Sequence, residues 1–342
     1  MTSRLQELAA RIATAGHMPR RAALAAAAGA LAGLPAIGRA QTGADWPNQA
    51  VRYINLFPPG GATDTLSRIY CAKMSDITGQ QFVVENRSGS GGVVGTDAIA
   101  KSRPDGYTIG LSSIASQAIA PTLYANLPYD AAKDFTYVSG LWQLPNLVVV
   151  NNDLPVRTVP ELLALLKANP GKHAFGSSGA GTTPHLSGEL LKQMAGIDML
   201  HVPYRGGAPA LLDLMAGRVQ LIMDNIPGLL PAARDGKIRA LAVTGPQRSP
   251  VVPDLPTMAE FLPGFEMTSW GAVCGPAGLT RTIVERLSAF TKQALENPDL
   301  VRGYQELGAT PWWTTPDGLV AFRAKEEARL APVIRASGAR VE

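Results

Sequence analysis

Residues 56–68, LFPPGGATDTLSR, form the stretch whose residue types most clearly suggest ligand chemistry. Two prolines end an apolar run, Gly60 and Gly61 follow, and Thr63 and Asp64 stand where a helix is expected to begin and are predicted to cap it. Glycine lets a ligand approach the backbone closely. Free N–H groups and the positive end of the dipole at a helix N-terminus bind anions without a cationic side chain. We interpret this loop as part of a carboxylate site.

A second stretch, GSSGAGTTPHL at 176–186, has a similar composition in the other half of the chain. Gly179 and Gly181 open the loop, and Thr182 or Thr183 is expected to cap the helix that follows. Either loop alone would be interpreted as an ordinary strand-to-helix turn. Two equivalent loops, one in each half, favour a shared ligand in a cleft between the halves.

Two charged residues near the second loop have roles that the sequence leaves open. Asp224 ends the apolar segment LIMD just before an expected helix. It either accepts a hydrogen bond from a ligand donor or caps that helix. Arg205 follows HVPY, and we interpret it as a solvated loop residue rather than as a partner of a carboxylate.

The motifs for catalysis and cofactor binding are incomplete. Ser178, His185 and Asp224 can be drawn as a hydrolase triad, but Ala180 stands where G-x-S-x-G needs its last glycine. GSGGVVG at 89–95 resembles a dinucleotide-binding fingerprint, but its last glycine is displaced by one position. The 4 histidines lack the spacing of metal ligands. We therefore predict no catalytic residue, no cofactor and no metal.

The first 41 residues are predicted to be an export signal peptide. Arg20 and Arg21 precede the apolar run 22–37, and small residues lead to an expected cleavage near Ala40. The run is shorter than the ~20 residues of a membrane span. The twin arginine leaves both the Sec and the Tat route open. The segment carries the whole formal net charge of +4, so the mature chain has no electrostatic basis for binding nucleic acid.

Short apolar strands followed by glycine-rich turns and amphipathic helices recur along the mature chain. Strands are expected at 51–57, 81–86, 107–113, 173–178, 199–204, 219–225 and 238–245. Strands that alternate with helices of 10–15 residues predict parallel α/β sheets. The units form two sets that separate near 140–150, and the C-terminal segment from EMTSWGAVCGP onward is expected to return to the first set.

Two cysteines, Cys71 and Cys274, remain in this exported chain. An oxidising periplasm would permit a disulfide between them. The sequence does not establish whether their Cα atoms lie close enough, and the alternative is a pair of buried thiols.

Several segments together resemble the Bug-type periplasmic solute-binding proteins, the receptor family of tripartite tricarboxylate transporters. The resemblance covers roughly 46–342. Its signatures are PPGGATD (58–64), ENRSGSGGVVG (85–95), PDGYT (104–108), LPYDAAKDF (127–135), GSSGAGTTPHLSGEL (176–190), HVPYRGGAPALLDLMAGRV (201–219), RALAVTGPQRSP (239–250) and DLPTMAE (254–260).

The resemblance implies a two-lobed α/β fold of the type II periplasmic-binding class. Each lobe is expected to hold a mainly parallel sheet flanked by helices, with two crossover segments as the hinge. The implied lobes are 44–143 plus 266–342 for lobe 1 and 144–265 for lobe 2. Residues 1–41 are left as the signal peptide.

The resemblance also implies a function. The family captures small carboxylates, which include di- and tricarboxylates, acidic amino acids and aromatic acids, and passes them to the membrane subunits of a transporter. The protein is then a periplasmic monomer and not an enzyme. An exported ligand sensor for a membrane signalling partner is the first alternative, and an exported hydrolase is the second.

The family pattern indicates which residues contact the ligand. The positions carried over are Gly61, Ala62, Asp64, Ser178, Gly181, Thr182 and Thr183, with Tyr204 and Asp224 as further candidates. One departure concerns IASQ at 114–117, where many relatives have a glycine and a histidine. A more apolar wall at Ile114 and Ala115 would suit an apolar or aromatic acid.

Overall fold

The structure, a computed structural model, describes residues 45–341. The predicted signal peptide and its cleavage position lie outside the described residues. The strands are β1 (Val51–Asn55), β2 (Phe82–Asn86), β3 (Thr108–Ser113), β4 (Phe135–Val150), β5 (Ala174–Ser177), β6 (Leu200–Pro203), β7 (Leu221–Asn225), β8 (Arg239–Val243), β9 (Thr268–Pro276) and β10 (Thr310–Pro311). The α-helices are α3 (Ala62–Thr78), α4 (Val93–Ala100), α5 (Ala120–Leu123), α6 (Val159–Ala168), α7 (Thr183–Ala195), α8 (Gly207–Met215), α9 (Ile226–Arg234), α10 (Arg281–Leu295), α11 (Pro298–Glu306) and α12 (Pro316–Ser337). Three short helical turns are η1 (Ser90–Gly92), η2 (Ala115–Ile119) and η3 (Met258–Glu260).

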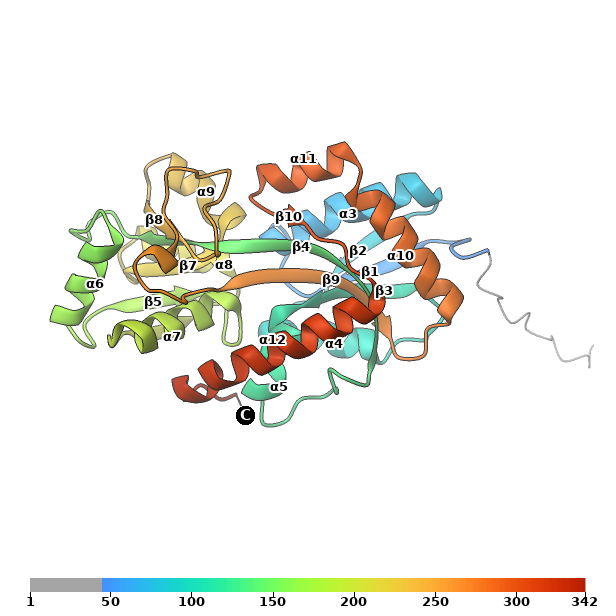
Figure 1. The fold of residues 1–342 in the computed structure, drawn as a ribbon, viewed down its shortest axis with the longest axis horizontal. Helices are drawn as coiled ribbons and strands as arrows, with labels where there is room; N and C mark the ends of the chain where they lie inside the picture. Colours follow the sequence, from blue (N-terminus) through green and yellow to red (C-terminus); the bar gives the residue numbers. More distant parts are fainter. Residues whose placement is uncertain (1–44, 342) are drawn as a thin grey trace, which may run out of the picture. The chain divides into compact units, whose positions relative to one another are not determined.

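The strands form one 10-stranded sheet with the order β2-β1-β3-β9-β4-β7-β5-β6, and β8 and β10 also pair with β4. At one end β2, β1 and β3 run parallel, and at the other end β7, β5 and β6 run parallel. Strand β9 is antiparallel to β3 and to β4, and β4 is antiparallel to β7. The two parallel groups confirm the predicted α/β class, and the long strands β4 and β9 join them (Figure 1).

Strand β4 runs through residues 140–150 without a break, so one continuous strand connects the two groups of strands there. Residues 135–145 of β4 pair with β9, whereas residues 146–150 pair with β7 and β8. Register shifts near Tyr137 and Gly140 interrupt the ladder to β9. Such irregularities bend a strand, so one strand can serve both groups.

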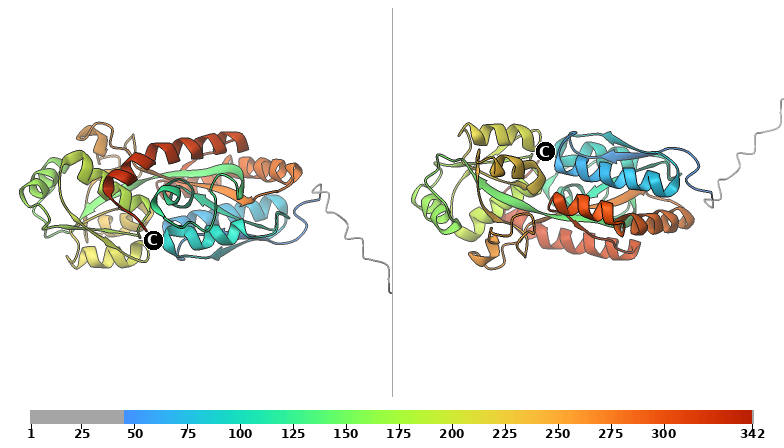
Figure 2. Two further views of the ribbon diagram at one scale, coloured as in Figure 1. Left: turned by 90° about the horizontal axis from the view of Figure 1, so that it is seen from below. Right: turned by 90° about the horizontal axis from the view of Figure 1, so that it is seen from above.

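The C-terminal part returns to the first group of strands, as predicted. Strand β9 lies between β3 and β4, and α10 packs on α3 and β4. Helix α12 packs against β4, η2 and α7. Figure 2 shows helices on both faces of the sheet, which explains why central strands such as β4 are buried almost throughout.

Glycines end the two helices that follow the predicted ligand loops. Helix α3 stops at Gly79 with φ +69°, and α7 stops at Gly196 with φ +63°. Both angles lie in the left-handed region, which only glycine adopts without strain. Both helices therefore end at a residue that can adopt this conformation.

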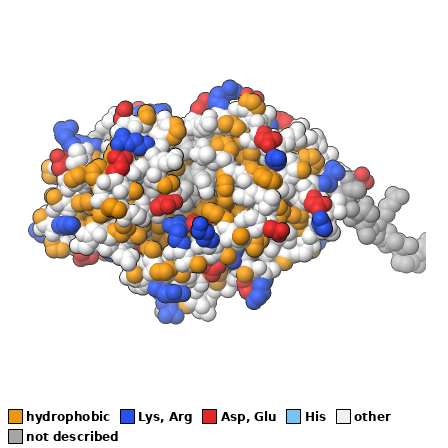
Figure 3. Space-filling model, in the orientation of Figure 1, with side chains coloured by type: hydrophobic (Ala, Val, Ile, Leu, Met, Phe, Trp, Pro, Cys, Tyr) orange, Lys and Arg blue, Asp and Glu red, His pale blue; other side chains and the backbone are white. Residues whose placement is uncertain are grey.

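Cys71 and Cys274 are two separate, buried free thiols, so the structure contains no disulfide between them. Burial raises the pKa of both thiols, which therefore remain protonated and unreactive. None of the helices within 45–341 is long and apolar enough to cross a membrane. On the face seen in Figure 3, basic and acidic side chains are interspersed.

Candidate ligand-binding cleft

A cavity of about 470 Å³ lies where several parallel strands end. Strands β1, β5, β6 and β7 lead at their carboxyl ends into α3, α7, α8 and α9, and the first residues of all four helices line it. This is the edge at which open α/β sheets bind ligands. The lining residues are Phe57, Pro58, Pro59, Gly60, Gly61, Ala62, Thr63, Ser113, Ile114, Ala115, Trp142, Ser178, Thr182, Thr183, Pro184, Arg205, Gly206, Gly207, Ala208, Pro209, Leu211, Asp224, Asn225, Gly228, Leu229, Ser269 and Trp270.

Convergence of four helix N-termini gives the cavity a positive potential that does not depend on basic side chains. Each N-terminus carries unpaired N–H groups and about half a positive elementary charge from the helix dipole. Arg205 and Asp224 are the only charged side chains among the described residues that line the cavity. Their charges are opposite, so the dipoles and amides determine the preference for an anion.

The residue at the N-cap position of α3 differs from the predicted one. The N-cap position is Gly61, with φ −80° and ψ 172°, and it has no side-chain cap. Thr63 and Asp64 therefore lie inside the first turn of α3, and the prediction that either caps the helix is wrong in position. The reason is that Asp64 reaches backward, and its carboxylate accepts the N–H of Gly60 at 2.9 Å.

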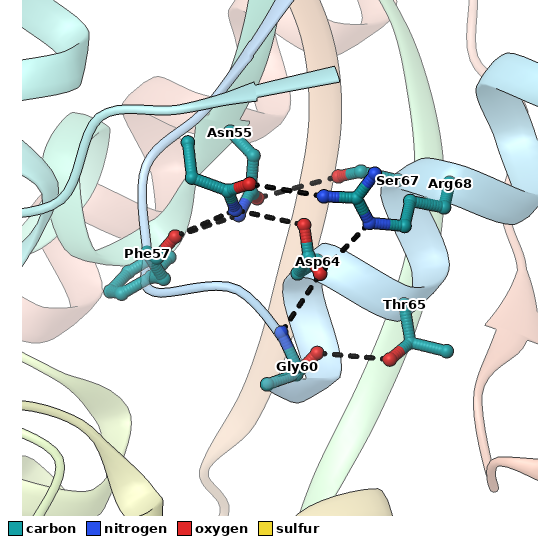
Figure 4. A network of polar contacts seen from close by, with 9 residues as sticks. Asn55, Phe57, Gly60, Asp64, Thr65, Ser67 and Arg68 are labelled. Carbon is teal, nitrogen blue, oxygen red and sulfur yellow. Dashed lines mark hydrogen bonds and ion pairs between the residues drawn. The ribbon is translucent and has the colours of Figure 1, made fainter. Parts of the chain in front are cut away.

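Asp64 is the centre of a polar network behind this loop (Figure 4). Only 3% of Asp64 is exposed, and besides the Gly60 N–H its carboxylate accepts Nε of Arg68 at 3.0 Å and Nδ2 of Asn86 at 2.8 Å. Burial alone would raise the pKa of Asp64, but these hydrogen bonds outweigh it and hold the pKa below its usual value. Asn86 also donates to the carbonyl of Phe57 at 3.0 Å, which fixes the start of the loop.

The loop before α7 has Thr182 at the N-cap position. Thr182 was one of the two residues predicted for this position, and Thr183 was the other. The hydroxyl of Thr182 donates to the carbonyl of Gly179 at 2.6 Å and caps no helical N–H group. Gly179 and Gly181 have φ +134° and +78°, so both positions require glycine. A Cβ on Gly181 would also lie 2.6 Å from Cδ2 of Leu123.

Two stacked histidines support this second loop from behind. The rings of His185 and His201 are 4.1 Å apart, Nδ1 of His185 accepts the N–H of Gly181 at 3.2 Å, and Nε2 of His201 lies 2.7 Å from the hydroxyl of Ser177. Burial lowers the pKa of His185 to about 4 and that of His201 to about 3. The cluster is therefore neutral at physiological pH. Because Gly181 donates to Nδ1, that nitrogen of His185 carries no proton.

The geometry removes the basis for a Ser178–His185–Asp224 triad. The Ser178 side chain lies beside Asp224, while Nδ1 of His185 accepts the N–H of Gly181. The carboxylate of Asp224 accepts the N–H of Asn225 at 2.7 Å. Burial raises the pKa of Asp224 to about 6, although the Asn225 N–H group and the Ser178 side chain oppose the shift. The N-cap of α9 is Asn225, so Asp224 does not cap that helix.

The predicted site residues separate into two groups. Those that line the cavity are Gly61, Ala62, Ser178, Thr182, Thr183 and Asp224, whereas Asp64, Gly181 and Tyr204 are not among its lining residues. The hydroxyl of Tyr204 donates to Asp213 at 2.7 Å, so this side chain is turned toward α8. Asp64 and Gly181 take part in hydrogen bonds that hold the loops, to the Gly60 N–H and to His185.

Several cavity residues were missed by the sequence analysis. Trp142 of β4 and Trp270 of β9, each 1% exposed, form part of the wall. Nothing in an apolar strand sequence distinguishes a side chain that faces a cavity from one that faces the core. Arg205, interpreted as a solvated loop residue, is exposed and lines the cavity. The apolar wall expected at Ile114 and Ala115 is part of the lining.

Hydrogen bonds connect the floor of the cavity to both long strands. The hydroxyls of Thr183 and Ser269 are 2.6 Å apart, and Nδ2 of Asn225 donates to Ser269 at 2.9 Å and to Asn146 at 2.7 Å. Asn146 belongs to β4 and Ser269 to β9, so the network ties the α7 and α9 N-termini to the two strands that join the parallel groups. Within residues 45–341, no cluster of His, Cys, Asp and Glu side chains is suited to a metal ion.

Comparison with known proteins identifies relatives across most of the chain. Residues 66–339 match the model of the tripartite tricarboxylate transporter family receptor. An R. palustris protein solved with adipate is 38% identical, with a TM-score of 0.83, and the match covers 86% of this chain and 100% of that one. The periplasmic binding protein BugD is 31% identical, with a TM-score of 0.81 and coverage of 87% and 100%. MatC from Rhodopseudomonas palustris with bound malate is 31% identical, with a TM-score of 0.78 and coverage of 84% and 100%.

These matches confirm the resemblance seen in the sequence. They also confirm the two-lobed fold of periplasmic binding proteins, in which β4 and β9 connect the two parallel groups of strands of this chain.

Proposed function

The chain belongs to the tripartite tricarboxylate transporter receptor family, and from this premise we propose that it captures a small carboxylate in its cleft and delivers it to membrane subunits of a transporter. The observation that carries the proposal is the convergence of four helix N-termini on one cavity. The proteins of this family are solute-binding receptors, and related proteins have been solved with adipate and with malate.

The proposed contacts come from the residues at the helix starts. The N–H groups of Gly61 and Ala62 at α3, and of Thr182 and Thr183 at α7, would share the negative charge of one ligand carboxylate. Ser178 and Asp224 complete the wall beside them. Arg205, which also lines the cavity, is a candidate partner for a second carboxylate.

The rest of the cavity suits an apolar ligand body. Ile114, Ala115, Trp142, Leu229 and Trp270 are apolar lining residues away from the helix starts. Such walls with a few polar groups are typical of small-molecule sites. We propose that the ligand is a di- or tricarboxylate, an acidic amino acid or an aromatic acid.

We propose that the lobes are residues 44–143 plus 266–342 and residues 144–265. Ligand contacts from both sides would then favour a closed arrangement of the lobes, with β4 and β9 as the crossovers. Receptors of this family act in the periplasm. We therefore propose export of this chain by Sec or Tat with cleavage near Ala40, and action as a monomer.

The test is thermal unfolding of the purified protein with citrate, adipate, malate, aspartate, benzoate and terephthalate. A ligand that binds only the folded state adds about 2.7 kcal/mol of stability at 100 times its dissociation constant. At least one of these carboxylates is expected to raise the unfolding midpoint. No shift with any of them would contradict carboxylate capture.

An Ala62→Pro variant tests the role of the amides directly. Ala62 is the first residue of α3 and follows an extended Gly61, so proline fits there and removes only an N–H group. Because a hydrogen bond to a charged group contributes about 1.5–3 kcal/mol, affinity is expected to fall about 10- to 100-fold. Arg281→Pro, which places proline at the start of the remote helix α10, is the matched control and should bind normally. Equal affinity of both variants would contradict the amide site.

A further inference from the structure

Asp224 is an unusual residue for a cavity that attracts anions. Only 8% of it is exposed, and it is the only acidic side chain among the described residues of the lining. Its carboxylate accepts the backbone N–H of Asn225, and the neighbouring Ser178 side chain lowers its pKa; both groups are uncharged. No lysine, arginine or histidine within 45–341 forms an ion pair with it.

The surroundings leave one oxygen of this carboxyl group open to the cavity. A Cβ built on Gly207 would lie 2.9 Å from Oδ2 of Asp224, so glycine at this position leaves that oxygen uncovered. Gly206 and Gly207 both line the cavity at the start of α8. Oδ1 accepts the Asn225 N–H group, which leaves Oδ2 as the oxygen with room for another donor.

The absence of a pairing cation is informative because a suitable one is near. Arg205 lies two residues before Gly207 and lines the same cavity, yet it forms no ion pair with Asp224. A buried carboxylate without a cationic partner is costly, because burial removes most of its hydration. A cavity that keeps such a group needs a donor from the ligand to compensate for this cost.

We infer that Asp224 is a specificity residue that accepts a hydrogen bond from a hydroxyl or ammonium group of the ligand. The inference rests on the proposed capture of a carboxylate by the helix N-termini. In the bound state the carboxylate lies at the starts of α3 and α7, and a substituent of the same ligand reaches Oδ2 of Asp224. The site therefore selects hydroxy- and amino-substituted carboxylates over unsubstituted ones.

Matched ligand pairs test this selection by isothermal titration calorimetry on the purified protein. Malate and succinate differ only in a hydroxyl group, aspartate and succinate differ only in an ammonium group, and mandelate and phenylacetate repeat the hydroxyl comparison on an aromatic acid. A hydrogen bond to a charged group corresponds to an affinity ratio of about 10- to 100-fold. At least one substituted acid is expected to exceed its unsubstituted partner by this ratio. The pair that does so identifies the donor as hydroxyl or ammonium.

The Asp224→Ala variant distinguishes recognition from simple repulsion. If Asp224 accepts the ligand donor, the variant loses the preference, and the unsubstituted acid binds as well as before or better. If Asp224 only repels anions, both members of a pair gain affinity equally and the ratio is unchanged, which would overturn the inference. Asp224→Asn, which keeps the shape and a carbonyl acceptor, is expected to retain part of the ratio.

Ser178→Ala provides a second control, because the Ser178 side chain lies beside the same carboxyl group and lowers its pKa. If Asp224 acts only by holding the loop of Ser178, this variant would abolish the preference in the same way. We expect it to lower the affinities of both members of a pair together and to leave their ratio intact.

The outcomes separate this inference from the proposed function. Tight binding of succinate or phenylacetate with no preference for the substituted acids overturns donor recognition and leaves carboxylate capture in place. Binding of only unsubstituted acids, such as adipate or terephthalate from the thermal unfolding panel, likewise overturns donor recognition alone. Binding of none of these five acids and of none of the acids in that panel overturns both.

Discussion

The loops before α3 and α7 both lead to helix starts at the same cavity, but one loop is held by a charged group and the other by neutral groups. Each presents N–H groups at a helix start to the same cavity. The first is held by an ionised carboxylate, Asp64, which is paired with Arg68 at 3.0 Å. The second is held by two neutral imidazoles, His185 and His201, stacked 4.1 Å apart.

The exposure to solvent of the supporting side chains explains why one loop is held by an ion pair and the other by neutral imidazoles. Arg68 keeps 53% of its side chain exposed, so the charge that pairs with Asp64 remains hydrated. His185 is only 4% exposed, and a charge at that position would lose its hydration without a counter-ion. A loop near the surface can therefore be fixed by an ion pair, whereas a buried loop is better fixed by uncharged acceptors. The two supports should respond differently to substitution and to pH.

Asp64→Ala is expected to have the largest effect. The substitution removes the acceptor for the Gly60 N–H, Arg68 and Asn86, so three hydrogen bonds that hold the loop are lost together. We expect a loss of about 3 kcal/mol in the free energy of unfolding, measured in urea, together with weaker carboxylate binding. Asp76→Ala is the control, because Asp76 is 68% exposed in its pair with Lys73 and should contribute little. Unchanged affinity in Asp64→Ala would contradict the idea that this network positions the ligand amides.

Acid should weaken the second support before the first. An unfolded histidine has a pKa of about 6.5, whereas burial lowers the pKa of His185 to about 4 and of His201 to about 3. Between these values the unfolded chain binds more protons than the folded one, so stability falls as the pH drops from 6.5 toward 4. The pKa of Asp64 is also depressed, and its contribution is lost only as the pH falls below about 4, the value of a free carboxyl group.

His185→Gln separates these two pH ranges. The variant should lose about 2 kcal/mol less stability than the wild type between pH 7 and pH 5, as measured by urea unfolding at each pH. His173→Gln removes a histidine outside the stacked pair and controls for the loss of a titratable group. A wild-type protein whose stability stays flat from pH 7 to pH 5 would contradict neutral, buried imidazoles behind the loop.

The sequence was sufficient to predict those features that depend on neighbouring residues. The glycine-rich stretches marked both loops and the starts of the helices that follow them. The parallel groups of strands followed from the alternation of strands and helices. Strand β4 was not predicted as one strand, because its pairing with β9 in one part and with β7 and β8 in the other is determined by the tertiary fold.

The supports of the loops depend on contacts between distant parts of the chain. Asn86 is 22 residues from Asp64, and His201 is 24 residues from Ser177, so no local pattern connects them. Asp64 and Gly181 were carried over as ligand contacts, and in the structure neither is among the residues that line the cavity. His185 was considered only as a catalytic base, because its environment was unknown. The residue types were visible in the sequence, but their roles depended on burial.

One threonine hydroxyl near each loop can be removed by the same Thr→Ala substitution, and these two variants are expected to have the smallest effects. Thr182 donates to the carbonyl of Gly179 at 2.6 Å in a partly buried position, and Thr65 donates to the carbonyl of Gly61 at 3.1 Å in an exposed one. Thr182→Ala should lower stability by about 1 kcal/mol and weaken carboxylate binding about fivefold, because it loosens the loop that carries the amides.

Thr65→Ala should change both quantities by less than about 0.5 kcal/mol, since an exposed hydroxyl can bond to water and alanine favours the helix. Thermal unfolding and titration calorimetry of the two variants measure the contrast directly. A larger effect of Thr65→Ala would mean that the exposed loop, despite its ion pair, is the less firmly held of the two. The link between burial of a loop and the choice of uncharged supports would then fail.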